Sequence, residues 1–190
     1  LRGGVKIVSF FQRLLLFAHT FALDNGVGLT PTMGWGTWNL FGCYAVNWNE
    51  TIIREMADAM VSSGMKEAGY SYINLDGGWL GGRNTATGAP HGDLTKFPSG
   101  IPALVDYVHS KGLLFGIYRD RHRGYGFETI DATTYASWGV DCLKNDGYGA
   151  YSPTFPSSSA IYGTMRDAIN KTGRRIVLNV KFDLEPEGFS

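Results

Sequence analysis

The apolar residues of this chain follow two alternating patterns: short continuous runs, and longer stretches in which apolar positions recur every three or four residues. Short runs are typical of buried strands and the longer repeat of amphipathic helices. We expect strands at 32–39, 70–75 and 112–118, in a run that begins at Val140, and at 175–180. We expect helices at about 49–64, 102–110, 128–138 and 159–170, and a glycine-rich loop over 81–92.

The first of these helices has the clearest boundaries. Asn49 is the expected N-cap because its side chain can accept a hydrogen bond from a free backbone N–H of the first turn. Gly64 is the expected end of the helix. One face is predicted to be buried, and it carries Ile52, Ile53, Met56, Ala59 and Met60.

Strands that alternate with helices predict a parallel sheet with helical crossovers. A (β/α)8 TIM barrel is favoured over an open doubly wound sheet, because every expected strand ends in polar or aromatic residues, whereas a doubly wound sheet gathers its ligand residues at one switch point. No glycine-rich phosphate-binding motif lies at the start of the first helix, which further disfavours a nucleotide-binding doubly wound sheet. A whole barrel needs about 250 residues. The chain therefore resembles the first four to five β/α units of one.

The run from Val140 to Gly147 carries the clearest chemical signal. Alternate side chains of a strand share a face, so Cys142, Lys144 and Asp146 should point the same way. A lysine and a carboxylate at the carboxyl end of a barrel strand lie where catalytic groups gather. The alternative is a solvated ion pair at a surface strand end. Recurrence of polar strand ends along the chain favours the site.

The N-terminal residues differ in character from the rest. Residues 7–22 are largely apolar, with Thr20 and Ala22 where a small-x-small cleavage signal would lie. We therefore expect residues 1–22 to be a secretory signal peptide and 23–190 to be the truncated barrel. The run is too short for a membrane span. A buried or frayed helix is the alternative. Secretion, or delivery to a lysosome or vacuole, is compatible with sequons at Asn49 and Asn170.

Composition narrows the range of partners. The formal net charge is +0 and no basic stripe is present, so nucleic acid is not an expected partner. The 4 histidines lie at unrelated places with no metal-ligand spacing, and neither a metal nor a cofactor is expected. Aromatic residues make up 14% of the chain, beside 26 glycines. Aromatic faces suit a carbohydrate ligand and equally an ordinary core.

Several motifs in order make the chain similar to a known family. The motifs are Leu23-Asp24-Asn25-Gly26, Thr30-Pro31-Thr32-Met33-Gly34-Trp35, Ala57-Asp58-Ala59-Met60-Val61-Ser62-Ser63-Gly64, Ala68-Gly69-Tyr70, Phe97-Pro98-Ser99-Gly100, Gly116-Ile117-Tyr118 and Ala136-Ser137-Trp138-Gly139-Val140-Asp141. With these residues the chain resembles glycoside hydrolase family 27, the α-galactosidases and α-N-acetylgalactosaminidases, from about residue 23 to 175.

The resemblance implies a retaining exo-glycosidase that hydrolyses terminal α-D-galactosyl residues, with a carbohydrate substrate and, in the full-length protein, a possible homo-oligomer. It implies that Asp146 is the nucleophile and that Lys144 hydrogen-bonds sugar hydroxyls. Trp38 would line the sugar pocket, Asp76 would bind sugar hydroxyls, and Tyr118 would lie beside the nucleophile.

Departures from the family pattern open alternatives. Asp76-Gly77-Gly78-Trp79 stands where the family has Asp-Asp-Cys-Trp, so Gly77 replaces a sugar-binding carboxylate. A β-L-arabinopyranoside, which differs at the 6-position, would miss that contact less, and an α-N-acetylgalactosaminide is a further alternative. A degenerate, non-catalytic sugar-binding relative also stays open.

The cysteines depart from the family as well. Gly78 replaces the expected partner of Cys43, and Tyr148 stands at one end of a second family disulfide whose other end is also missing. We therefore expect Cys43 and Cys142 to be free thiols. The family acid/base is an aspartate beyond residue 190. For that reason we expect the 190-residue chain alone to be inactive, and we interpret the acidic residues at 183–187 as a solvated tail.

Overall fold

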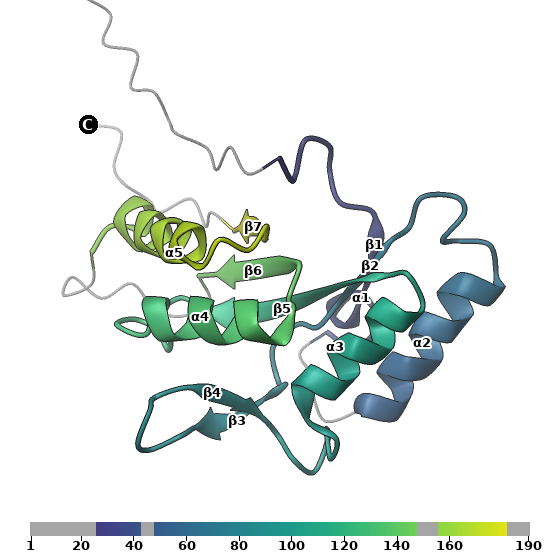
Figure 1. Cartoon of the computed structure of the whole chain (residues 1–190), viewed down its shortest axis with the longest axis horizontal. Helices are drawn as coiled ribbons and strands as arrows, with labels where there is room; N and C mark the ends of the chain where they lie inside the picture. Colours follow the sequence, from purple (N-terminus) through teal and green to yellow (C-terminus); the bar gives the residue numbers. More distant parts are fainter. Residues whose placement is uncertain (1–25, 43–47, 148–155, 182–190) are drawn as a thin grey trace, which may run out of the picture.

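The computed structural model describes residues 26–42, 48–147 and 156–181 (Figure 1). The expected signal peptide, Cys43, Tyr148 and the acidic residues at 183–187 lie outside these ranges. The strands are β1 (Gly34–Gly36), β2 (Tyr72–Asn74), β3 (Leu80–Arg83), β4 (Pro90–Gly92), β5 (Leu114–Asp120), β6 (Cys142–Asp146) and β7 (Val177–Val180). The helices are α1 (Thr37–Phe41), α2 (Glu50–Ser62), α3 (Gly100–Ser110), α4 (Glu128–Trp138) and α5 (Ser158–Thr172).

The main sheet has five strands in the order β1-β2-β5-β6-β7, and each neighbouring pair is parallel. Each new strand is added on the same side of the one before it, so right-handed crossovers place the connecting helices on one face. Consecutive helices contact each other, from α2 through α3 and α4 to α5, as Figure 1 shows. This arrangement is a partial (β/α) barrel and confirms the predicted fold class.

The boundaries of the four expected helices agree closely with the sequence pattern, but the expected strand at 32–39 is too long, because β1 ends at Gly36 and residues 37–39 belong to α1. Asn49 is the N-cap of α2, and its Oδ1 accepts a hydrogen bond from the Ile52 N–H at 3.2 Å. The helix ends at Ser62, just before Gly64, and α4 spans the predicted residues. One residue of the expected buried face is wrong: Ala59 is exposed, and Ala57 is buried instead.

The glycine-rich segment after β2 is not a loop throughout, which corrects the sequence-based expectation. It contains an antiparallel hairpin of β3 and β4. The hairpin has few of the β-branched and aromatic residues that reveal a strand. A tertiary contact holds it instead, because the Arg83 guanidinium donates two hydrogen bonds to the Asp131 carboxylate on α4, at 2.6 and 2.9 Å.

The two faces of the parallel sheet have different characters. Phe115, Ile117 and Leu143 point toward the helices and are at most 1% exposed. The alternate residues point to the other face, which is the inside of the incomplete barrel. There Gly116 is required by close approach, since a Cβ at this position would lie 1.9 Å from Asn74 Oδ1. The cavity that the strands do leave open lies above this layer, at their carboxyl ends.

No helix within the described ranges is both long and apolar enough to cross a membrane.

Candidate active site

The five residues predicted from the sequence line one cavity of about 610 Å³ at the carboxyl ends of the parallel strands. Strand register brings them together. Gly36, Asn74, Gly116 and Cys142 form one row across the sheet. Two positions after each member of this row stands one of the predicted residues, in the order Trp38, Asp76, Tyr118 and Lys144. Asp146 follows two positions after Lys144, at the last residue of β6.

Lys144 is the centre of the charged groups. Its ammonium forms an ion pair with Asp76 Oδ2, and it lies 3.9 Å from Asp146 Oδ2. The shared contact confirms that Lys144 and Asp146 point to the same face of β6. Asp146 is 6% exposed, so its carboxylate is largely withdrawn from water but still borders the cavity. A buried carboxylate needs such a partner to remain charged.

Two aromatic rings flank the ammonium. The Nζ of Lys144 lies 5.4 Å from the ring centroid of Trp38 and 5.4 Å from that of Tyr118, within the range of a cation–π contact. Burial raises the pKa of the Tyr118 phenol, and the nearby carboxylates of Asp146, Asp120 and Asp76 raise it further. Tyr118 therefore keeps its proton at neutral pH and can donate a hydrogen bond into the cavity.

Backbone amides orient both carboxylates in the same way. The Gly77 N–H donates to Asp76 Oδ1 at 2.8 Å, and the Gly147 N–H donates to Asp146 Oδ1 at 2.6 Å. The repeated Asp-Gly pair at two strand ends is a signal that the sequence analysis did not use. It leaves the second oxygen of each carboxylate directed toward Lys144.

Two positioning residues were missed by the sequence analysis. The Asp76 N–H donates to the hydroxyl of Thr37, which is 1% exposed, at 2.8 Å. The indole N–H of Trp79 donates to the Tyr118 carbonyl at 2.8 Å. Both contacts join strand ends that lie 39 residues apart in sequence, so no local pattern could have revealed them.

Further charged residues line the cavity. Asp120, Arg123 and Lys181 were not predicted as site residues, yet all three border it. Lys181 Nζ lies 3.8 Å from Asp146 Oδ1. Arg119 borders the cavity too, and its guanidinium forms buried ion pairs with Glu128 and Asp131 of α4.

The described cysteine is a free thiol, as predicted. Cys142 is buried, and burial, with a smaller effect from Asp141, raises the pKa of its thiol to about 12. The thiolate is the reactive form of cysteine, so Cys142 is not a nucleophile at neutral pH. Among the described residues, no group of three or more His, Cys, Asp or Glu side chains could hold a metal ion.

The parallel β/α sheet, with carboxylates, a lysine and aromatic rings around a cavity at its carboxyl end, places the chain in the class of (β/α)-barrel proteins. The chain belongs to the alpha-galactosidase A family, because the family model matches residues 30–186. This confirms the resemblance to glycoside hydrolase family 27.

Individual relatives agree with the family match. Alpha-galactosidase A of Cellvibrio japonicus is 50% identical over 159 residues, which cover 80% of this chain and 38% of the relative. Human alpha-galactosidase A is 40% identical over 178 residues, covering 86% and 41%. The crystal structure of alpha-galactosidase I from Mortierella vinacea superposes with a TM-score of 0.73 at 40% identity, covering 83% of this chain and 42% of that one. The chain thus spans less than half the length of these relatives.

Proposed function

We propose that the protein that contains this chain hydrolyses terminal, non-reducing α-D-galactosyl residues with retention of the anomeric configuration. Asp146 is the nucleophile, and Lys144 and Asp76 bind sugar hydroxyls. Trp38 and Tyr118 form the aromatic walls against which the C–H face of the sugar packs. A second carboxyl group, about 5–5.5 Å from the first in retaining enzymes, serves as acid and then as base. It comes from outside this chain.

One observation supports the proposal most strongly. Asp146 is 6% exposed and contacts two ammonium groups at 3.8 and 3.9 Å, yet it borders an open cavity. A carboxylate that is charged, held by its neighbours and accessible from one side is suited to attack an anomeric carbon. The relatives from Cellvibrio japonicus and human both carry the name alpha-galactosidase A.

The proposed reaction has two steps. In the first step, an Asp146 oxygen bonds to the anomeric carbon while the bond to the leaving oxygen breaks, and the second carboxyl group protonates that oxygen. In the second step, water attacks the anomeric carbon, the second carboxylate takes its proton, and Asp146 is released. Fixed contacts from Lys144 and Asp76 would orient the sugar for both steps.

The test is hydrolysis of aryl α-D-galactopyranoside and aryl β-L-arabinopyranoside by the full-length protein, with the anomer of the first-formed product followed by NMR. Release of α-D-galactose as the first product would support the proposal. Inversion would contradict it. A folded protein that hydrolyses neither glycoside would favour a non-catalytic sugar-binding relative.

Gly77 favours a β-L-arabinopyranosidase as the second candidate. Gly77 borders the cavity, and a Cβ at this position would meet the Tyr118 ring at 3.6 Å, which is ordinary van der Waals contact. Its backbone φ is not in the left-handed region. The site therefore has room at this position for a Cβ that this protein lacks, beside the proposed sugar position. A pentopyranoside, which has no exocyclic hydroxymethyl group, loses least from that gap.

The Gly77→Asp variant is expected to raise kcat/KM for the α-D-galactoside relative to the β-L-arabinopyranoside by about tenfold or more. A hydrogen bond from a sugar hydroxyl to a charged carboxylate contributes about 1.5–3 kcal/mol. Steady-state kinetics with both aryl glycosides measure the ratio. Gly77→Asn, which adds similar volume without charge, should change it less. A ratio that moves toward the arabinopyranoside would contradict this interpretation of Gly77.

We also infer passage through the secretory pathway, toward an extracellular or lysosomal location. The apolar segment at residues 7–22 supports this, as do the sequons at Asn49 and Asn170, both of which are exposed. Digestion of the protein from its native host with an N-glycosidase should lower its mass by that of a glycan, mapped to Asn170 or Asn49 by peptide mass spectrometry. A peptide map with both asparagines unmodified and residues 1–22 retained would contradict the inference.

A further inference from the structure

Lys181 lies directly after β7 and extends the charged site to a fifth strand. The last register pair between β6 and β7 joins Asn145 to Val180, so the next position along β7 stands opposite Asp146. From there the ammonium of Lys181 reaches Asp146 Oδ1 at 3.8 Å. The side chain is 50% exposed and borders the cavity.

A buried hydrogen-bond chain fixes the backbone of Lys181. The Tyr162 hydroxyl on α5 donates to the Lys181 carbonyl at 2.5 Å. The same hydroxyl accepts a hydrogen bond from the Arg121 guanidinium at 2.9 Å. Tyr162 is 6% exposed and Arg121 3%. The end of β7 is therefore anchored to α5, and the ammonium lies beside the Asp146 oxygen that Lys144 does not contact.

Asp146 thus has one ammonium at each of its oxygens. Lys144 contacts Oδ2, and it also forms an ion pair with Asp76. Lys181 contacts Oδ1, which also accepts the Gly147 N–H. Lys144 divides its charge between two carboxylates, so Lys181 adds a second cation beside Asp146.

We propose that Lys181 is a positioning residue for Asp146, and that Lys181 accelerates the second step of the reaction more than the first. The proposal rests on the proposed function. In the first step the carboxylate loses its negative charge as its oxygen bonds to the anomeric carbon. In the second step that bond breaks, the electron pair returns to Asp146, and water supplies the new oxygen. A fixed cation stabilises the carboxylate and not the neutral ester, so it favours the step that releases the carboxylate.

The Lys181→Met variant of the full-length protein should therefore accumulate the glycosyl-enzyme. With an aryl glycoside whose phenol leaves readily, kcat should fall about tenfold, as expected for a cation near 4 Å in a partly exposed site. KM should fall in parallel, so that kcat/KM, which reports the first step, stays within about threefold. Stopped-flow kinetics should show a burst of phenol of one equivalent, and intact mass spectrometry should show the added sugar.

Two control variants separate charge from structure. Lys181→Arg keeps the cation and should restore kcat to within about threefold of the wild type. Lys111→Met removes the same charge from an ion pair with Asp58, on a distant surface, and should leave kcat unchanged. If the wild type turns over substrate and Lys181→Met has the same kcat, the role of Lys181 is overturned while the proposed function stands. The same holds if kcat/KM of Lys181→Met falls together with its kcat. A folded wild-type protein without turnover would overturn the proposed function, and this inference with it.

Discussion

Replacing Asp146 by asparagine is expected to lower kcat of the full-length protein on aryl α-D-galactoside about a thousandfold or more. Asparagine keeps the shape of the side chain but removes the charge that would attack the anomeric carbon. Loss of a covalent nucleophile leaves only the rate enhancement from binding and electrostatics. Asparagine also keeps an oxygen that can accept the Gly147 N–H, so the variant is expected to fold. Steady-state kinetics measure the loss of kcat, and a thermal melt measures separately whether the variant is as stable as the wild type.

Azide distinguishes a nucleophile from a residue that only supports the site. In Asp146→Ala, azide should enter the space left by the carboxylate and restore turnover, with a glycosyl azide of inverted configuration as the product. Asp106→Asn changes an exposed carboxylate on α3 and should leave kcat within about twofold. Asp146→Asn with more than about a tenth of wild-type kcat, or azide without effect on a folded Asp146→Ala variant, would contradict the assigned role.

The parts of the site that could be predicted from the sequence are those that follow from alternation within one strand. Lys144 and Asp146 are two residues apart on β6, and they do share a face. Parallel strands bring Trp38, Asp76 and Tyr118 to the same end of the sheet as Lys144. The repeated strand–helix pattern predicts that parallel order. The chemical roles assigned to these residues came from the family resemblance.

The contacts that could not be predicted all depend on tertiary structure. Thr37 and Trp79 each bond to a strand end 39 residues away. Lys181 was not predicted because the strand before it is apolar, and its pattern did not show which positions face the cavity. The hairpin of β3 and β4 was missed because Arg83 anchors it to α4 through a contact that spans 48 residues.

Loss of that anchor gives the largest expected effect on stability. Asp131 is 0% exposed and lies between two guanidinium groups, accepting from Arg83 at 2.6 and 2.9 Å and from Arg119 Nε at 2.8 Å. Arg119 is itself 3% exposed and pairs with Glu128 at 3.2 Å. The Asp131→Ala variant removes the shared carboxylate and leaves two cations facing each other. Removing one partner of a buried pair costs about 3–5 kcal/mol.

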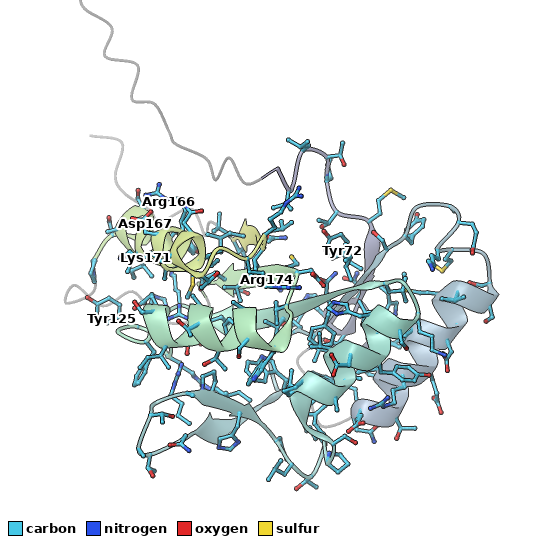
Figure 2. All side chains as sticks on the ribbon, in the orientation of Figure 1. Tyr72, Tyr125, Arg166, Asp167, Lys171 and Arg174 are labelled. Atoms are coloured by element: carbon cyan, nitrogen blue, oxygen red, sulfur yellow. The ribbon has the colours of Figure 1, made fainter. Side chains whose placement is uncertain are left out.

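The free energy of unfolding, measured by denaturant titration of the full-length protein, should fall by that amount in Asp131→Ala. The fall should be smaller in Asp131→Asn, which keeps one oxygen acceptor. Asp167→Ala is the matched control, since Asp167 is 55% exposed and pairs with Arg166 on the surface of α5 (Figure 2). An exposed pair of this kind contributes about 0.2–1 kcal/mol. If Asp131→Ala costs no more than Asp167→Ala, the buried pairs do not anchor the hairpin. In that case apolar packing between β5 and α4 must stabilise this side of the cavity without the buried ion pairs.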